Sequence, residues 1–446
     1  MAESSAVGFF CRKFAPCYAL PTLGGDTEMR KLLLGSALAL AAFGATPALA
    51  DTVCEWMEFS QGIATAAAPP PSAPRTPDHD RAGTQVALAM FEALNAIDRR
   101  YESYLKFPAG DPRASQDVAA ATAAFQVLLA HYPSQKSALE DNYAIALGAV
   151  PNAGARQLGM AIGEAAAKAA LASGGIDPAV VQTPYLPRTQ PGVWTATALP
   201  VFEPFSVAFK PWILSRADAV RPPPPPALTS DRWARDYDEV KRLGAKTSKD
   251  RTADQSLMAR YRITPSMMPT MRLIADGRGR SLVANARLFA LSAMVADDTG
   301  MATADAKLFY NFWRPVTAIR NGEIDGNSAT APDASWEPLI GTPNHPEYPC
   351  AHCSYSAAAA ELLKAEVGNA PPGGVRVASR SIPTSNVQVL PSFDEWVRQV
   401  SYSRTLGGVH YRFSNEAGEE IGRKVAALAL DKIMRPLPKA KWARKA

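Results

Sequence analysis

Three of the five histidines in the chain, His345, His352 and His410, lie close together near the C-terminal end. Each is flanked by prolines or glycines, which favour loops. An imidazole on a loop can act as an acid, a base, a nucleophile or a ligand near neutral pH. The other two histidines, His79 and His131, are expected to be structural. The histidine pattern therefore predicts a chemical site in the C-terminal part of the chain.

Lys307 and Arg314 precede these histidines in the segment KLFYNFWRP. Their spacing of seven residues is about two helical turns, so a helix through the segment places both side chains on one face. Arginine offers a planar fork of N–H donors and lysine a point charge, which together suit a tetrahedral oxyanion. Taken alone, such a pair also fits a solvated helix face.

The segment PEYPCAHCSYSAAAAELL follows, in which Pro346 and Pro349 predict an extended turn that leads into an alanine-rich helix. The first backbone N–H groups of a helix have no intrahelical acceptor and can bind an anion. His352 falls in the first turn of this helix, beside whatever those amides bind. This position suits a general acid or base.

The segment SYSRTLGGVHYRFSNE completes the pattern. Arg404 ends one helix, Gly407 and Gly408 break it, and Ser414 is expected to cap the last helix. His410 is therefore presented on a loop, where it is available as a nucleophile or as a ligand.

In this order, the three segments resemble the signature K-x6-R-P, P-S-G-H and S-R-x5-H-x3-D of vanadium-dependent haloperoxidases and type 2 phosphatidic acid phosphatases. Lys307–Pro315, Pro349–His352 and Ser403–His410 carry its three parts. The stretches NFWRPVTAIRNG and TPNHPEYP are similar to bacterial secreted haloperoxidase homologues. The helical pattern from about Arg81 fits the α-bundle of that family, so the resemblance covers most of the mature chain and implies one large helical bundle domain.

The resemblance also implies roles for the matching residues. The equatorial oxygens of vanadate or phosphate would be bound by three cations, Lys307, Arg314 and Arg404. The backbone N–H of Ala351 would add a further donor. His410 would be the apical vanadium ligand, or the phosphorylated nucleophile of a phosphatase, and His352 would be the acid–base residue.

Two activities follow from the resemblance, and both use small-molecule substrates. A haloperoxidase carries vanadate as its cofactor and oxidises a halide with hydrogen peroxide. A phosphatase needs no cofactor, because His410 attacks the phosphorus of a phosphoester and His352 protonates the leaving alcohol. We favour the haloperoxidase, with the phosphatase and a non-catalytic oxyanion-binding homologue as the alternatives. A homo-oligomer is left open.

His345 lies where the resemblance implies a side chain that flanks the halide, which is histidine in bromoperoxidases and phenylalanine in a chloroperoxidase. It therefore favours bromide, and Trp313 is a second candidate for the halide site. The alternative for His345 is a loop residue bonded to a carbonyl.

Three positions depart from the signature. Cys350 replaces the serine whose hydroxyl bonds to the oxyanion, and a thiol is a much weaker donor. Ala351 replaces glycine, which keeps the amide but disfavours a positive φ. Ser414 stands where many members have the aspartate that orients the nucleophilic histidine. That task is left to Glu416, to a backbone carbonyl or to nothing.

Cys350 and Cys353 permit other interpretations. Together with His345 and His352 they could ligate zinc, because thiolate and imidazole are its preferred donors. A thioredoxin-like role is disfavoured because no βαβ pattern surrounds the pair. Cys54 is the remaining cysteine of the predicted mature chain, so one disulfide is the maximum, and the Cys350–Cys353 spacing permits a local one.

The elements that carry these residues are predicted to be helices. The chain has 446 residues, 47% of them hydrophobic and 20% charged, which is enough for a sizeable core. Its net charge of +5 is small, which disfavours nucleic-acid binding. Apolar residues recur at helical spacing from Val86 to Ile97, and alanine-rich segments of the same character lie around 116–131, 155–173, 280–296, 354–366 and 415–433. The predicted fold class is mainly α.

The N-terminal part has the features of a targeting segment. Residues 29–50 combine a positive start, an apolar stretch and a small-residue cleavage pattern, so they are predicted to be a secretory signal peptide of a periplasmic or secreted protein. Residues 1–28 are then an upstream leader. Residues 51–79 are predicted to be a Pro/Ala-rich tether, 80–434 a single helical domain and 435–446 a basic tail. No later stretch has roughly 20 uninterrupted apolar residues, so no membrane span is expected.

Overall fold

The structure, a computed structural model, describes residues 51–67, 81–177, 186–198, 201, 205–277, 279–382 and 387–438. The α-helices in this part are α1 (Thr52–Ala66), α2 (Ala82–Ile97), α3 (Gln116–His131), α4 (Lys136–Gly148), α5 (Ala153–Leu171), α6 (Asp231–Gly244), α7 (Ala253–Tyr261), α8 (Met268–Ala275), α9 (Leu282–Tyr310), α10 (Pro315–Arg320), α11 (Ala351–Val367), α12 (Phe393–Leu406) and α13 (Arg412–Lys432). Short 3-10 helices span Pro133–Gln135, Phe205–Ala208, Ala217–Val220 and Gly322–Ile324. The strands β1 (Pro265–Ser266), β2 (Val375–Ser379) and β3 (Gln388–Leu390) pair in an antiparallel sheet of that order. The prediction of a mainly α fold is confirmed.

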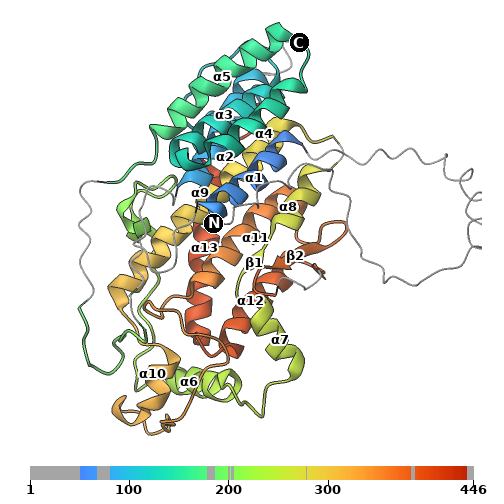
Figure 1. Ribbon diagram of the computed structural model, residues 1–446. Coiled ribbons are helices and arrows are strands. Elements are labelled where there is room, and N and C mark those ends of the chain that lie inside the picture. The colour runs from blue at the N-terminus through green and yellow to red at the C-terminus, as the bar shows by residue number, and fades with distance from the viewer. Residues whose placement is uncertain are drawn as a thin grey trace, which may run out of the picture. The chain divides into compact units, whose positions relative to one another are not determined.

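The helices form two groups that α9 connects (Figure 1). In the N-terminal half, α2, α3 and α5 pack together and α4 packs against α3. In the C-terminal half, α11 packs along α13, with α9 and α12 beside them. α9 also packs against α2, and the chain from Ala50 to Ala446 forms one compact unit. The alanine-rich segments predicted from the sequence correspond to α3, α5, α9, α11 and α13, although α9 runs well beyond its predicted end, to Tyr310.

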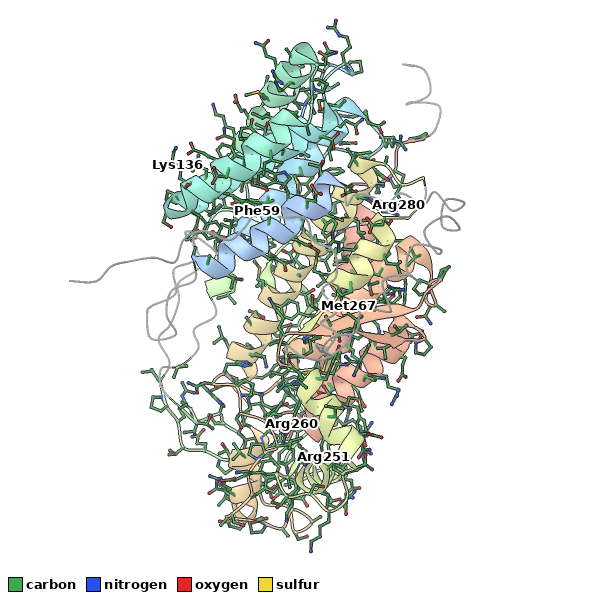
Figure 2. The ribbon with its side chains drawn as sticks, turned by 45° about the vertical axis from the view of Figure 1, so that its right-hand side comes forward. Phe59, Lys136, Arg251, Arg260, Met267 and Arg280 are labelled. Atoms are coloured by element: carbon green, nitrogen blue, oxygen red, sulfur yellow. A yellow bond between two sulfur atoms is a disulfide. The ribbon has the colours of Figure 1, made fainter. Side chains whose placement is uncertain are left out.

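The folded body begins at α1, and this corrects the prediction of a tether over 51–79. Asp51 caps α1 by accepting a hydrogen bond from the Cys54 N–H at 2.8 Å. The helix buries Val53, Cys54 and Trp56 in the main hydrophobic core, and it packs against α2, α3 and α9. Figure 2 shows α1, labelled at Phe59, alongside these helices. The proline run that suggested a tether begins only after α1, so it says nothing about 52–66. Residues 68–79, like the predicted leader over 1–28 and signal peptide over 29–50, lie outside the described residues.

Replacing Trp56 with alanine is expected to lower the free energy of unfolding by about 3–5 kcal/mol, because it removes a large side chain that is 2% exposed. Denaturant unfolding of the purified protein measures the change. Gln61→Ala is the matched control, since Gln61 is exposed on the same helix. Equal midpoints for the two variants would mean that α1 does not belong to the cooperative fold.

The close packing of α13 on α11 depends on a glycine. A Cβ atom added at Gly422 would overlap the backbone carbonyl of Ser354, so no other residue fits without moving a helix. Nearer the start of the two helices, the Cys350 N–H donates to the Ser414 carbonyl at 3.1 Å. The N-terminal turns of α11 and α13 are therefore held side by side.

An aromatic cluster surrounds α6 and consists of Trp233, Tyr237, Phe312, Trp313, Tyr348, Tyr411 and Phe413. Trp233 stacks on Trp313 with ring centroids 5.9 Å apart, and Tyr411 stacks on Phe413 at 5.1 Å. Asp236 of α6 accepts the Phe413 N–H at 2.9 Å, at the start of α13. The cluster therefore joins the loop after α9, the loop before α11 and the loop before α13. These are the three loops that carry the predicted site.

The first residues of the segment 435–446, which was predicted to be a basic tail, are bound to the fold. Arg435 forms an ion pair with Glu102 at 2.9 Å, and the Leu437 N–H donates to the Arg100 carbonyl at 2.8 Å. Residues 439–446 lie outside the described part. Among the helices described, none combines the length and apolar character needed to cross a lipid bilayer.

Candidate oxyanion site

Two cations converge on the backbone of the short segment from His345 to Glu347. Lys307 Nζ donates to the carbonyls of Pro346 at 2.9 Å and Glu347 at 2.7 Å. Arg314 Nε donates to the His345 carbonyl at 2.9 Å. This segment thus fixes the position of both cations relative to each other, and the side chains of Lys307 and Arg314 are buried.

The route by which these two cations meet differs from the prediction of one continuous helix. Lys307 lies in the last turn of α9, which ends at Tyr310, and Asn311 then adopts a left-handed conformation with φ 43°. Arg314 follows in an extended conformation and directly precedes α10. The proline at the first position of α10 favours this extended residue before it. The two side chains are therefore brought together by a turn and not by one helix face.

His410 is held between a carboxylate and a guanidinium. Its Nδ1 lies 2.7 Å from Glu347 Oε1, and its Nε2 lies 3.3 Å from Arg314 Nη1. A guanidinium can only donate, so Nε2 accepts and the proton of the neutral ring is on Nδ1. Gly408, with φ 76°, makes the turn that brings His410 to this position after α12. Glu347 is the partner that the sequence analysis missed.

Glu416, which the sequence analysis offered as the partner of His410, lies elsewhere. Its carboxylate forms an ion pair with Arg232 at 2.5 Å, and both side chains are about half exposed. Ser414 does not cap α13 either, because the helix begins at Arg412 after the N-cap residue Tyr411. The predicted cap at Ser414 is therefore wrong, and Glu416 is excluded from the alternatives that were left open for orienting His410.

Arg404 is a buried cation that lacks acceptors. It lies in the last turn of α12 and is 2% exposed, and its Nε and Nη1 atoms are buried without a hydrogen-bond partner. Burial, together with the charge of Arg314, lowers the pKa of Arg404 to about 9. Unsatisfied buried donors on a charged group are costly, so this position calls for an acceptor.

The positive charge of the pocket exceeds the negative charge around it. Burial lowers the pKa of Lys307 well below its ordinary value and that of Arg314 to about 10, and in both cases only Glu347 among the carboxylates opposes the shift appreciably. Burial in turn raises the pKa of Glu347 to about 7, against the effect of the two cations. Three cations and one carboxylate leave a net charge that a bound anion would offset.

His352 lies in the first turn of α11, as predicted. Its Nε2 is 2.8 Å from the Ile263 carbonyl, so in the neutral ring Nε2 carries the proton. The charge of Arg404, and then burial, lower the pKa of His352 to about 3. An anion beside Arg404 would oppose that effect and make the ring more basic. The protonation of His352 is thus coupled to what Arg404 binds.

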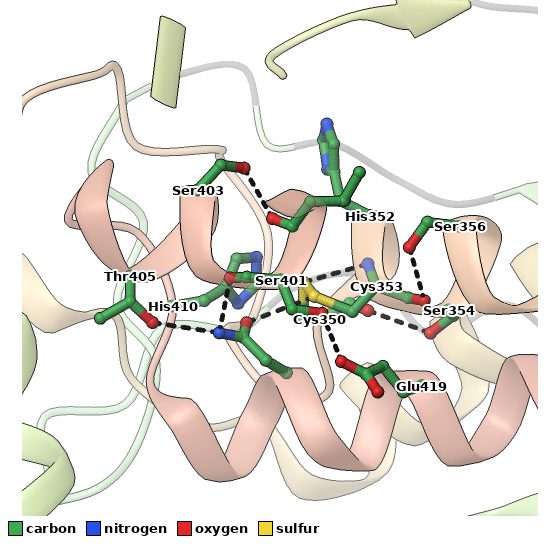
Figure 3. Close-up of a disulfide and its surroundings, with 12 residues drawn as sticks. Cys350, His352, Cys353, Ser354, Ser356, Ser401, Ser403, Thr405, His410 and Glu419 are labelled. Atoms are coloured by element: carbon green, nitrogen blue, oxygen red, sulfur yellow. Dashed lines mark hydrogen bonds between the residues drawn. A yellow bond between two sulfur atoms is a disulfide. The ribbon is translucent and has the colours of Figure 1, made fainter. Parts of the chain in front are cut away.

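Cys350 and Cys353 form a disulfide at the start of α11 (Figure 3). The Cys350 sulfur accepts the Cys353 N–H and caps the helix, but as a disulfide it has no proton to donate to an oxyanion. In this state the Cys350 side chain therefore donates no hydrogen bond to an oxyanion. Within the described residues no group of three or more histidine, cysteine or acidic side chains could hold a metal ion, so the zinc alternative has no support.

Ala351 is compatible with its place in the pattern. It is the first residue of α11, and it is not among the residues with positive φ. The alanine therefore keeps the amide that the resemblance requires, without backbone strain. As the first residue of the helix, it has an N–H group with no acceptor inside the helix.

The two candidates for a halide site lie in different surroundings. The His345 ring contacts Arg314, with Nδ1 3.1 Å from Nη2, and Nδ1 is also 3.0 Å from the Pro346 carbonyl. Burial and the two cations hold the pKa of His345 well below its ordinary value. Trp313 instead packs in the aromatic cluster, where its Nε1 is buried without a partner. Of the two, His345 is the one in contact with the cationic pocket.

Comparison with known proteins matches a family model and several solved structures. The model of the VCPO second helical-bundle domain matches residues 287–438, a range that includes Lys307, Arg314, His352, Arg404 and His410. No curated protein matches the chain by sequence.

The solved structures resemble most of the chain at low sequence identity. The first bacterial vanadium-dependent iodoperoxidase has a TM-score of 0.70 and 20% identity, over 87% of this chain and 97% of that one. An apo-type bacterial vanadium-dependent chloroperoxidase has a TM-score of 0.61 and 19% identity, over 82% and 95%. A holo-type bacterial chloroperoxidase has a TM-score of 0.60 and 18% identity, over 86% and 93%. The chain therefore has the fold of these proteins.

Proposed function

Because residues 287–438 carry the VCPO second helical-bundle domain and the chain has the fold of vanadium haloperoxidases, we propose that this protein is a vanadate-dependent haloperoxidase. The observation that carries the proposal is Arg404, which is buried next to Arg314 and has two donor atoms that lack acceptors. A tetrahedral oxyanion supplies negative charge on several oxygens at fixed separations, which suits the planar fork of N–H donors of an arginine.

Vanadate fits the donor set of the pocket. The three cations Lys307, Arg314 and Arg404 would hold its oxygens, with the Ala351 N–H as a further donor. When bound, vanadate supplies a Lewis-acidic centre that activates hydrogen peroxide for the oxidation of halide. His410 Nε2 would be its protein ligand, because this nitrogen carries the lone pair of the ring.

The residues around the group have separate tasks. Arg314 Nη1 donates to His410 Nε2. If vanadate were bound at Nε2, this N–H of Arg314 would be available to donate to its oxygens. Lys307 has a third N–H beyond its two carbonyl bonds. His352 would move the proton, since the negative charge of the group raises its pKa from the low value set by Arg404.

We further propose bromide as the halide and the periplasm or the exterior as the location. The choice of bromide rests on His345, which contacts Arg314 in the pocket. The location rests on the predicted signal peptide over 29–50. The substrates are then hydrogen peroxide and a halide, both small molecules.

One pair of assays on the purified protein tests the proposal. Bromination of a dye with hydrogen peroxide should depend on added vanadate, and inorganic phosphate should inhibit it by competing for the same cations. Release of phosphate from an aryl phosphate should be weak. Phosphate release that vanadate inhibits, without any bromination, would establish the phosphatase alternative. The absence of both activities would favour a non-catalytic homologue.

A further inference from the structure

Glu347 is a buried carboxylate to which the sequence signature gives no role. Its side chain has no exposed surface, and Oε1 lies 2.7 Å from His410 Nδ1 and 3.3 Å from the Tyr411 backbone nitrogen. Burying a carboxylate is unfavourable unless it is paired. Its partners here are the ring of His410 and the amide that follows that ring.

We propose that Glu347 is the positioning residue of His410, which holds the imidazole with its proton on Nδ1 and its lone pair on Nε2. The inference rests on the proposed function of His410 as the residue that bonds to the oxyanion. In the signature, the aspartate at the position of Ser414, in the third segment, orients the histidine. Here Glu347, in the second segment, would do so.

Hydrogen bonds hold the backbone of Glu347 on both sides, which restricts the position of its carboxylate. The Glu347 N–H donates to the Phe312 carbonyl at 2.8 Å, and the Glu347 carbonyl accepts from Lys307 at 2.7 Å. Phe312 itself packs in the aromatic cluster. The same residue therefore orients His410 through its side chain and Lys307 through its backbone.

The contact at the second ring nitrogen, Nε2, favours the same tautomer. Arg314 Nη1 is 3.3 Å from Nε2, and a proton on Nε2 would point one donor at another. Glu347 accepts at Nδ1 and Arg314 donates at Nε2, so both neighbours favour a single orientation of the ring. A histidine held in this way presents Nε2 to the space between the cations.

The surroundings of Ser414 are consistent with Glu347, and not residue 414, orienting His410. Its hydroxyl is buried without a well-formed hydrogen bond, as is Glu347 Oε2, and it lies close enough to lower the pKa of the Glu347 carboxyl. An aspartate at 414 would bring a second carboxylate next to the first in a buried position, where like charges repel. Glu347 and Ser414 therefore form a compatible pair, and an aspartate at 414 fits only when Glu347 is replaced.

The test compares four variants with the wild-type protein, namely Glu347→Gln, Glu347→Ala, the double variant Glu347→Ala with Ser414→Asp, and Glu416→Gln. The last is the matched control, because Glu416 is the exposed acid that the sequence analysis offered for the same role. Equilibrium dialysis gives the affinity for orthovanadate and for inorganic phosphate separately. Proton NMR of protein labelled with 15N-histidine reports the Nδ1–H of His410 without any bound anion.

Glu347→Gln and Glu347→Ala should weaken vanadate binding by about 10–100-fold, as is typical for loss of a residue that orients a ligand histidine. Phosphate binding should not weaken, because no bond to Nε2 is required and a negative charge has been removed. The low-field Nδ1–H signal of His410 should shift upfield in both variants and stay in place in Glu416→Gln. Ser414→Asp should restore vanadate affinity in the Glu347→Ala background.

Equal losses of vanadate and phosphate binding would overturn the inference, because they indicate a general structural role. An unchanged Nδ1–H signal in Glu347→Gln would also overturn it. If the wild-type protein binds no vanadate, the proposed function fails, and the NMR signal still decides whether Glu347 positions His410.

Discussion

Replacing His410 with alanine is expected to reduce vanadate-dependent halide oxidation by a factor of about 10³ or more. The ring is the group whose lone pair, on Nε2, lies beside the guanidinium of Arg314, and it is 1% exposed. Alanine removes the bond between protein and oxyanion and leaves Glu347 without its partner. The cations can still attract an anion, so weak phosphate binding should persist.

The measurement is the rate of dye bromination at saturating peroxide and vanadate. His131→Gln is the control, because this histidine lies in α3 and bonds to Gln85, outside the pocket. Thermal unfolding should show that both variants are folded at the assay temperature, with a lower Tm for His410→Ala because Glu347 loses its buried partner, so that a loss of rate is not a loss of fold. Wild-type rates in the His410 variant would remove it from the site.

Replacing Arg404 with methionine is expected to weaken the binding of vanadate and of phosphate by at least about 10²-fold, and to stabilise the fold by about 1–3 kcal/mol. The two effects have one cause. Arg404 is buried with two unpartnered donor atoms and next to Arg314, so its charge destabilises the fold and is suited to an anion. Methionine keeps most of the volume and removes the charge.

Equilibrium dialysis measures the affinities, and denaturant unfolding measures the stability. Arg398→Met is the control on the same helix, because Arg398 is exposed and forms an ion pair with Glu395. That substitution should change both quantities little. A variant at 404 that binds as well as the wild type, or that is less stable, contradicts the role given to Arg404.

Local signals predicted the parts of the site that local structure determines. The proline-bounded turn before α11 put His352 in the first turn of that helix, and the glycines after α12 put His410 on a loop. In both cases the backbone preference of a few neighbouring residues decides the conformation. The mainly α class was predictable for the same reason, from the helical spacing of apolar residues in α2 and the alanine-rich segments.

Contacts between segments that are distant in the sequence could not be predicted from local residue patterns. Glu347 meets His410 only because the aromatic cluster joins their loops, and nothing in the segment EYP marks its acid as buried. One signal was available. The third segment has Ser414 where the signature has an orienting carboxylate, and the second segment contains an acid, Glu347, five residues before His352. The prediction that one helix carries both Lys307 and Arg314 failed for a related reason. Asn311 interrupts the helix in a left-handed conformation that residue spacing does not reveal.

The wrong prediction for α1 has a different cause. Its apolar positions, Val53, Trp56 and Ile63, follow helical spacing, yet the proline run just beyond it dominated the interpretation of the whole range 51–79. The disulfide between Cys350 and Cys353 was a permitted outcome of spacing, but spacing alone did not decide it against a free thiol. That outcome removes Cys350 from the donors of the pocket and leaves the Ala351 amide in place.

The proposed function requires that Lys307, Arg314, Arg404 and His410 form one oxyanion site. Equilibrium dialysis of the wild-type protein against orthovanadate, with inorganic phosphate as competitor, tests it most directly. We expect saturable binding of one vanadate per chain that phosphate displaces, and loss of this binding in Arg404→Met. Absence of saturable binding, or binding that phosphate does not displace, would contradict it.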